Sequence, residues 1–417
     1  MKENRWEFLK AGHLPTLLTA FVYFDVCFSV WVVNGAMAPF ISEEFHLTPA
    51  QKGFMVSVPV IAGALMRFPL GLLAQYIGRK RAAMLEMSVV SACLVWGYFF
   101  TTSLGAVLVM GIALGVAGAS FGVALSLGSG WYPPKFKGLA MGIAGAGNSG
   151  TVIAMLAAPP LAFAYGWRTV YLLGLIPMGL AMVLLQIFAK EPPDREDKKL
   201  KDYLKILVDR DAWVFNLMYS VTFGGFIGLA SFLPTLFHDH YNIPKQSVGI
   251  YVTIGVIAAS VLRVVGGWLA DRMGGLRVLY VIFGIILVST LGAAVMPTNP
   301  WVMAFVVALA MGAMGAGNGA VFQLVPLRFR AETAVAGSLV GEIGALAGGF
   351  LPNAMGLGKQ YFDSFAPGFL AGAALTICSV AVLALLSRNW THTWLGKGGK
   401  ARVDSVHGSG HSKEMMP

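Results

Sequence analysis

The chain repeats one apolar segment: GFMVSVPVIAGALMRFPLGLLAQYIGRKR at residues 53–81 returns as GIYVTIGVIAASVLRVVGGWLADRMGGLR at residues 249–277. At a constant offset of 196 residues, the matched positions include Gly53, Arg67, Gly71, Leu73, Ala74 and Gly78 with Gly249, Arg263, Gly267, Leu269, Ala270 and Gly274. Near an offset of 197, the glycines Gly115, Gly118 and Gly122 match Gly312, Gly315 and Gly319. Such self-similarity indicates a chain built from two homologous halves.

The composition around this repeat is that of a membrane protein. Hydrophobic residues make up 57% of the 417 residues, charged residues only 12%, and 51 residues are glycine. A soluble domain has roughly 45–50% apolar and about 25% charged residues, because its surface must be covered with charge. These values exclude a soluble enzyme, a nucleic-acid-binding domain and a disordered chain.

Twelve apolar runs are long enough for a helix of about 20 residues to cross the hydrocarbon core. Their length and low internal charge favour helices over strands. The runs cover residues 16–40, 51–74, 82–102, 104–130, 138–162, 168–189, 212–237, 247–270, 277–297, 300–324, 334–357 and 366–388. The sequence therefore predicts an all-α membrane protein with twelve transmembrane helices in two pseudo-symmetric six-helix bundles.

The bundles are expected over residues 1–189 and 212–388, joined by a charged linker at 190–211. The polar, Gly/Ser/Lys-rich tail at 389–417 is expected to be disordered. Six spans in each half make the repeats parallel, with their axis along the membrane normal. That is the design of two-halved secondary transporters, whose site lies near the midplane between the halves.

The basic residues predict the orientation. With both termini in the cytoplasm, cytoplasmic segments hold 24 of the 30 lysines and arginines, and outer loops hold four: Lys52, Arg168, Lys245 and Lys359. This bias follows the positive-inside rule for an even number of spans in the cytoplasmic membrane. The net charge of +10 thus has an explanation that needs no nucleic-acid partner.

Arg67 and Arg263 are the two basic residues left inside spans. Each lies 11 residues before the glycine that ends its span, which is roughly 16 Å of helix and about mid-bilayer. A charge at that depth costs about 2.5–3.5 kcal/mol or more and marks a functional site by default. Structural pairing is the alternative, with Asp25, Glu86 and Glu342 as the intramembrane acids. Two planar forks facing one cavity favour a planar oxyanion.

Glycine-rich segments mark spans 4, 5, 10 and 11: GVAGASFG (115–122), GLAMGIAGAGNSG (138–150), GAMGAGNG (312–319) and GSLVGEIGALAGGFLPNAMG (337–356). Close helix packing accounts for most such glycines. The functional alternative is that they admit a small ligand or let helices slide. Asn148 and Asn318 are amides within these runs, and each either donates to the anion or bonds a neighbouring helix.

The remaining reactive side chains indicate no cofactor. Cys27, Cys93 and Cys378 lie in apolar runs without metal-ligand or redox spacing. The seven histidines lie in polar segments or at the ends of runs. We therefore expect no metal site and no cofactor.

The motifs resemble those of the major facilitator superfamily and, within it, the nitrate/nitrite porters. Gly267-Trp268-Leu269-Ala270-Asp271-Arg272-Met273-Gly274 is similar to the superfamily's loop signature, and its first-half copy has Gln75 and Tyr76 in place of Asp and Arg. The porter signatures resemble Gly145–Gly150 in span 5 and Gly344–Pro352 in span 11. Further similar segments are Gly166–Arg168, Trp131–Lys135 followed by Gly138, and Gln323–Phe329.

This resemblance implies a nitrate or nitrite site between the halves, clamped by Arg67 and Arg263 with Asn148 as a polar contact. The family's span-7 pattern is similar to Tyr219-x-x-x-Phe223-Gly224, in which Tyr219 would bond the anion and Phe223 would wall the site. Phe121 would form the opposite wall, although helix packing is the plainer interpretation of these rings. The residues expected to serve conformational change or gating are Gly71, Gly78, Gly145, Gly147, Gly150, Gly267, Asp271, Arg272, Gly274, Gly344, Gly348 and Gly349.

Coupling has two alternatives. Moving an anion into a negative-inside cell costs about 2.3 kcal/mol per 100 mV, so net uptake needs protons, whereas nitrate/nitrite exchange does not. Asp25 and Glu342 are the candidate proton carriers, and structural hydrogen bonding is their other interpretation. An acid beside the arginines would stay ionised and carry no proton. Glu86 is expected to pair with basic residues near the cytoplasmic end of its span.

Three other functions stay open at this point. A small-carboxylate exchanger, similar to the oxalate/formate exchangers of the superfamily, also uses cations and glycine-rich helices. An anion channel and an integral-membrane enzyme are further alternatives, and no nucleotide loop or metal cluster supports the enzyme. The transporter is expected to act as a monomer.

Overall fold

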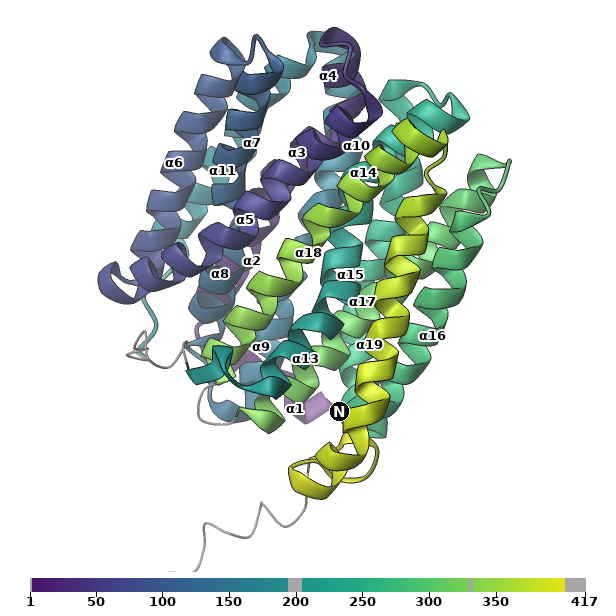
Figure 1. Ribbon diagram of the computed structural model, residues 1–417. Helices are drawn as coiled ribbons and strands as arrows, with labels where there is room; N and C mark the ends of the chain where they lie inside the picture. Colours follow the sequence, from purple (N-terminus) through teal and green to yellow (C-terminus); the bar gives the residue numbers. More distant parts are fainter. Residues whose placement is uncertain (1, 194–204, 330–332, 402–417) are drawn as a thin grey trace, which may run out of the picture.

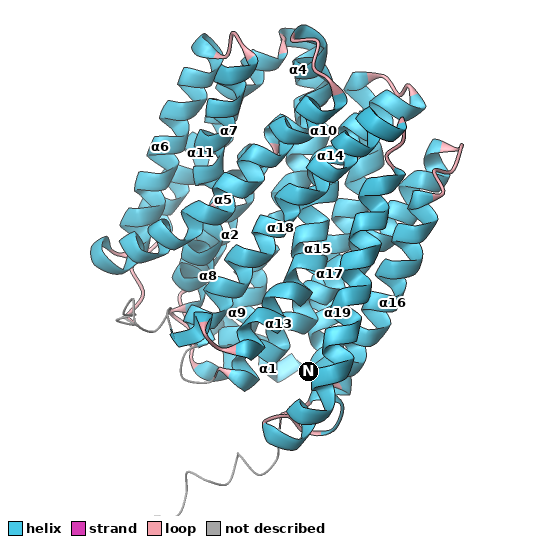
Figure 2. Ribbon diagram, viewed as in Figure 1, coloured by secondary structure: helices cyan, strands magenta, loops and turns pink. Residues whose placement is uncertain are grey.

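The computed structural model describes residues 2–193, 205–329 and 333–401. Within them, twelve helical spans are long and apolar enough to cross a membrane, as predicted. All of these spans are helical and run side by side (Figure 1, Figure 2). The protein is therefore a multi-pass membrane protein of the predicted all-α class.

The first half begins with α1 (Lys2–Ala11) and contains spans 1–6. Span 1 is α2 (Leu14–Trp31), α3 (Val33–Ala36) and α4 (Ala38–Glu44), and span 2 is α5 (Pro49–Ile77). Spans 3 and 4 are α6 (Arg79–Phe100) and α7 (Leu104–Gly118) with α8 (Ser120–Ser129). Span 5 is α9 (Pro134–Gly145), η1 (Ala146–Ser149) and α10 (Gly150–Tyr165), and span 6 is α11 (Trp167–Phe188).

The second half contains spans 7–12. Span 7 is α13 (Arg210–Tyr219), η2 (Ser220–Gly224) and α14 (Gly225–Tyr241), and span 8 is η3 (Lys245–Ser247) with α15 (Val248–Met273). Spans 9–12 are α16 (Gly275–Ala294), α17 (Pro300–Arg328), α18 (Thr333–Phe362) and α19 (Ala366–Thr393). A last turn, η4, covers Lys397–Gly399.

The repeat is visible in the backbone of the turns after spans 2 and 8. Gly78 and Gly274 end α5 and α15 with φ of +95° and +97°, a conformation that side chains other than glycine rarely adopt. Of the predicted gating glycines, these two therefore form matching turns. Four of the predicted runs are interrupted: span 1 divides at Val32 and Met37, span 4 divides at Ala119, span 5 has a short 3₁₀ turn, and span 7 contains a π-helical turn.

The two ends of the bundle are named after the parts of the chain that lie there. Figure 1 places α4 at one end, called the α4 end, and the N-terminus at the other, called the termini end. The division of the chain at residues 189 and 212 stays a prediction, because half of the linker, 194–204, lies outside the described residues.

The expected disordered tail differs from the structure over residues 389–401. Helix α19 continues to Thr393, and the η4 backbone packs on Gly274. Trp390 is buried, stacks on Phe215 at 5.3 Å between ring centroids, and donates from Nε1 to Asp211 at 2.7 Å. The buried tryptophan area outweighs the local Gly and Lys content, and residues 402–417 lie outside the described part.

Candidate functional site

The centre of the bundle brings Arg67 and Arg263 to one aromatic ring. The guanidinium carbon of Arg67 lies 5.1 Å from the centroid of Phe121, and that of Arg263 lies 5.8 Å from it. Arg67 comes from α5 in the first half and Arg263 from α15 in the second. The two arginines thus converge between the halves, as the repeat predicts.

Each arginine lies against a glycine of the opposite half, and the two glycines occupy equivalent positions of the repeat. Arg67 Nη1 donates to the Gly341 carbonyl at 2.6 Å, and a Cβ at Gly145 would lie 3.7 Å from Arg263 Nη2. Gly145 and Gly341 are separated by 196 residues, the same offset as the arginines. Spans 5 and 11 therefore present matching glycine backbones to the two side chains.

Both guanidinium groups keep a buried nitrogen without a partner. Among the described residues, Arg67 Nη2 and Arg263 Nη1 make no hydrogen bond, although Arg67 Nε donates to the Gly118 carbonyl at 3.1 Å. A buried N–H that bonds neither protein nor water costs about 1–3 kcal/mol or more when it is charged. Two such cations, one from each half, are suited to hold one anion.

Aromatic rings enclose this pair. Tyr219 stacks on Phe223 at 5.3 Å and 8°, and Phe223 faces Phe121 at 6.4 Å and 27°. Phe223 also lies 5.2 Å from the Arg67 guanidinium. The Tyr219 hydroxyl is within electrostatic range of both arginines, and it approaches Arg263 without meeting hydrogen-bond geometry. The three rings predicted for the site are therefore in one cluster with the arginines.

The π-helical turn of span 7 places two of these rings. It begins at Ser220, directly after Tyr219, and contains Phe223. One extra residue in the turn changes which side chains share a helix face, and such turns are frequent at functional sites. The apolar run over 212–237 predicts an uninterrupted helix, so this turn was not expected from the sequence.

The two asparagines differ in their environment. Asn148 is buried in η1, and with its amide nitrogen placed toward the backbone it donates to the Gly145 and Ala146 carbonyls. Asn318 is buried on α17, and neither its amide nitrogen nor its oxygen has a partner in the described residues. Its neighbour Gly319 packs on the backbone of Arg263. Asn318 thus has unused polar groups on a helix that packs against the Arg263 segment of α15.

The intramembrane acids also separate. Asp25 accepts a 2.5 Å hydrogen bond from the Ser149 hydroxyl and is also bonded by the Gly150 amide. Glu342 lies within electrostatic range of Arg67, and its Oε2 has no partner among the described residues. The prediction for Glu86 was wrong. Its carboxylate is buried within the first half, where it accepts a hydrogen bond from the Tyr23 hydroxyl of α2.

Most of the predicted gating glycines are packing positions. A Cβ would press on α2 at Gly147 and Gly150, and on Tyr219 or Ile227 at Gly344 and Gly348. A Cβ at Gly349 would press on Ile61, and one at Gly267 would lie 3.7 Å from the Gly319 carbonyl oxygen. Asp271 and Arg272 are exposed, with Arg272 over Trp268 at 4.1 Å, and Tyr76 is 78% exposed.

The halves are closed against each other at the α4 end. A Cβ at Gly53 would meet the Pro352 carbonyl, and one at the repeat-equivalent Gly249 would meet the Met155 carbonyl. Toward the termini end, two glycine positions on the same helices are open in the described structure. No neighbouring atom of the described residues lies within 4 Å of a Cβ at Gly71, one turn beyond Arg67, or at Gly142, one turn before Gly145.

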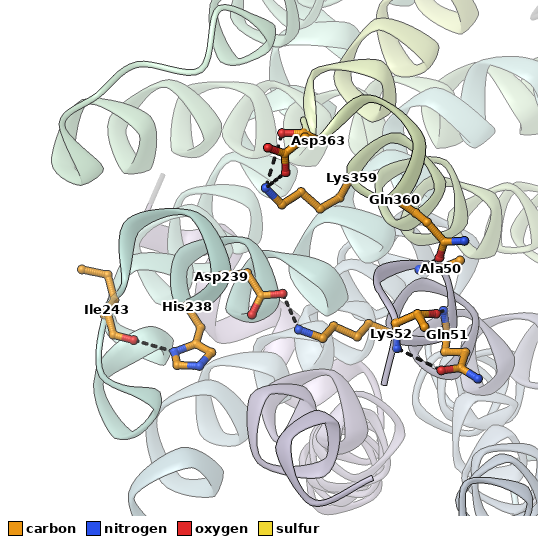
Figure 3. A network of polar contacts seen from close by, with 10 residues as sticks. Ala50, Gln51, Lys52, His238, Asp239, Ile243, Lys359, Gln360 and Asp363 are labelled. Carbon is orange, nitrogen blue, oxygen red and sulfur yellow. Dashed lines mark hydrogen bonds and ion pairs between the residues drawn. The ribbon is translucent and has the colours of Figure 1, made fainter. Parts of the chain in front are cut away.

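Ion pairs that were not predicted from the sequence also join the halves at the α4 end. Lys52 donates to Asp239 at 2.5 Å, and Lys245 pairs with Glu43 (Figure 3 shows the first). Glu43 and Asp239 are again 196 residues apart. The repeat offset between two acids that lie outside the predicted spans was the signal for these ion pairs in the sequence.

The other two basic residues assigned to outer loops are paired as well. Arg168 binds Glu44 at 2.5 Å, and Lys359 binds Asp363 at 2.6 Å. Burial raises the pKa of Glu44, but hydrogen bonds from Arg168 and Trp167 outweigh it and bring the pKa below its usual value. All four predicted outer cations therefore have carboxylate partners at one end of the bundle.

Residues 19–352 match the Major Facilitator Superfamily. The chain belongs to the major facilitator superfamily. A crystal structure of a bacterial homologue of the human lysosomal transporter Spinster has the same fold, with a TM-score of 0.70 at 19% identity, covering 91% of this chain and 98% of that one. The predicted superfamily and fold are thereby confirmed.

The curated relatives confirm the predicted branch of this superfamily. The chain is 30% identical to the nitrite extrusion protein of Bacillus subtilis (strain 168), over 88% of this chain and 93% of the relative. It is 29% identical to the probable nitrate/nitrite antiporter NarK1 of Thermus thermophilus, over 92% of each. It is 32% identical to the probable nitrate transporter NarT of Staphylococcus carnosus (strain TM300), over 78% of this chain and 83% of the relative.

Proposed function

We propose that this superfamily member carries nitrate and nitrite across the cytoplasmic membrane by alternating access. The observation that carries the proposal is the pair of unpartnered guanidinium nitrogens on Arg67 and Arg263. They come from repeat-equivalent positions and flank one ring, Phe121. Planar guanidinium forks bind planar oxyanions through in-plane hydrogen bonds, and the names of the curated relatives agree with this substrate.

Tyr219 and the aromatic rings complete the anion site. The Tyr219 hydroxyl is the third donor, and Phe121 and Phe223 exclude water from the faces of the bound anion. Electrostatic interactions are stronger in such a low-dielectric enclosure than in water. We assign Asn318, with both amide atoms unused, a polar contact next to Arg263, and Asn148 a structural role within η1.

The charges of the site favour exchange. Glu342 lies within electrostatic range of Arg67, and the two arginines give the empty site a net positive charge that one bound monovalent anion reduces. An uncompensated charge in the membrane interior is costly, so the loaded carrier changes conformation more readily than the empty one. Asp25 instead holds the 3₁₀ turn through Ser149. We therefore propose nitrate/nitrite exchange, with neither acid carrying a proton in each cycle.

The bundle supports a carrier with one end closed at a time. The α4 end is closed by glycine–carbonyl contacts and ion pairs between the halves, while Gly71 and Gly142 toward the termini end are open in the described structure. We assign the termini end to the cytoplasm, because 24 basic residues lie in the segments predicted there. The described conformation then faces inward, and the transporter acts as a monomer.

Uptake of labelled nitrate into proteoliposomes tests this function. Internal nitrite is expected to accelerate uptake, and an imposed pH gradient without nitrite is expected to leave it slow. Formate and oxalate are added as competitors. Uptake driven by the pH gradient alone contradicts exchange, and stronger inhibition by formate or oxalate than by nitrite contradicts the assigned substrate.

A further inference from the structure

The two arginines of the site are held unequally. Arg67 is 4% exposed, donates to two backbone carbonyls and lies 5.1–5.5 Å from the centroids of three rings. Arg263 is half-buried, and among the described residues Phe121 is the ring that its guanidinium faces. One arm of the clamp is therefore fixed, and the other is freer.

Of the three rings near Arg67, Trp31 is the one that belongs to the same half as Arg67 and is not shared with Arg263. Its centroid lies 5.5 Å from the Arg67 guanidinium carbon, and the side chain is 1% exposed. Phe121 is shared with Arg263, and Phe223 belongs to the opposite half. A cation over a desolvated indole face is attracted by the ring quadrupole, and tryptophan is the strongest partner of this kind.

The surrounding backbone fixes Trp31 in turn. Its Nε1 donates to the Pro59 carbonyl at 2.7 Å, and a Cβ at Gly63 would lie 2.5 Å from that nitrogen. A Cβ at Gly118, the last residue of α7, would also overlap the indole. The Gly118 carbonyl is also the acceptor of Arg67 Nε. One glycine thus admits the indole and orients the arginine.

In the described part of the second half, the equivalent positions form no such slot. The offset of 196 places Ile227 at the position of Trp31 and Ala259 at that of Gly63. At the position of Gly118, Gly315 packs directly on the Ala259 backbone. The difference between the two arms is therefore built into the sequence of the two repeats.

We propose that Trp31 is a positioning residue that orients Arg67 before the anion arrives, so that Arg67 is the fixed arm and Arg263 the movable arm of the clamp. This inference rests on the proposed function, because the arms need an anion to clamp. Trp31 acts through Arg67 and does not bind the anion itself. Its loss therefore weakens anion binding without slowing the conformational change.

Nitrate uptake kinetics of Trp31→Leu, Trp31→Phe and the wild type test the assignment, with Ile227→Val as the matched control in the second half. Loss of one desolvated cation–π contact predicts that Trp31→Leu raises KM about tenfold, with Vmax within about twofold of wild type. Trp31→Phe keeps a ring face and is expected to raise KM by less. Ile227→Val is expected to leave KM unchanged.

A structural role would give a different result. A KM within about twofold of wild type in Trp31→Leu, or a lower Vmax at unchanged KM, overturns the positioning role. An equal rise in KM for Ile227→Val also overturns it. If Trp31→Leu does not fold, Trp31→Phe decides by the same criteria. Absence of nitrate and nitrite uptake by the wild type itself overturns the proposed function and this inference with it.

Discussion

Arg67 Nη1 donates a 2.6 Å hydrogen bond to the backbone carbonyl of Gly341 in the opposite half of the protein. Gly341 is the repeat equivalent of Gly145, against which Arg263 lies. The same exchange of contacts, arginine of one half to glycine of the other, therefore occurs twice around the pseudo-axis. It brings two cations together at the centre of an otherwise apolar bundle.

This relationship predicts unequal effects of adding one methyl group at the two glycines. A Cβ at Gly341 would lie 3.3 Å from Phe121 and 3.6 Å from Arg67 Nη1, whereas a Cβ at Gly145 would have no atom nearer than 3.7 Å. Gly341→Ala is expected to raise the KM of nitrate uptake several-fold, since the fixed arm and its ring must move. Gly145→Ala is expected to change KM by less than about twofold. Equal effects of the two substitutions would contradict this geometry.

Alanine at Gly249 should open the α4 end. Its Cβ would overlap the Met155 carbonyl across the interface, so the closed arrangement loses stability while the opposite conformation does not. With the three natural cysteines replaced, a cysteine at the buried Ser57 reports opening to an impermeant thiol reagent. Gly249→Ala is expected to increase its labelling. The control is Gly71→Ala, where the described residues place no neighbouring atom within 4 Å of the added one.

The Lys52–Asp239 pair is expected to contribute more than the Lys245–Glu43 pair. Both side chains of the first pair are 16% exposed, whereas Glu43 is 68% exposed. Ion pairs at the surface contribute about 0–1 kcal/mol, and partial burial reduces screening by water and salt. A double-mutant cycle with Lys52→Met and Asp239→Asn, read by thermal unfolding, should give an interaction near 1 kcal/mol. A coupling no larger than that of the Lys245–Glu43 cycle would refute the ranking.

Glu44 should make stability depend on acid pH. Its pKa is lowered in the folded state, because hydrogen bonds from Arg168 and Trp167 outweigh the effect of burial. Its stabilising contribution is therefore complete above the usual glutamate pKa of about 4.3 and is lost as pH falls through the lower folded value. Glu44→Gln should flatten the decline of Tm on the acid side of that range. An unchanged acid slope would contradict the assignment.

The arginine site could be predicted from the sequence, because a charged residue in mid-membrane is costly and the repeat duplicates it. Arg67, Arg263, Phe121, Tyr219 and Phe223 indeed cluster together. The twelve spans followed from run length alone. Both results depend on properties that lie within one segment or recur at one spacing.

Contacts between distant segments could not be predicted in this way. Trp31 looked like any apolar residue of span 1, and its role depends on the absent side chains of Gly63 and Gly118. The Lys52–Asp239 pair joins α5 and α14 through residues 187 positions apart in the chain. Glu86 was wrongly expected to pair with basic residues because the direction of its side chain is set by packing on α2. Each case depends on which helix faces which.

The most direct test of the account is labelled nitrate uptake by Arg67→Lys and Arg263→Lys in proteoliposomes containing nitrite, with the folding of both variants checked by thermal unfolding. Lysine keeps the positive charge but loses the planar fork, so both folded variants are expected to lose exchange. Arg67→Lys should lose more, because it also gives up its bonds to Gly118 and Gly341. Normal nitrate exchange by both folded variants would contradict the clamp and the function proposed from it.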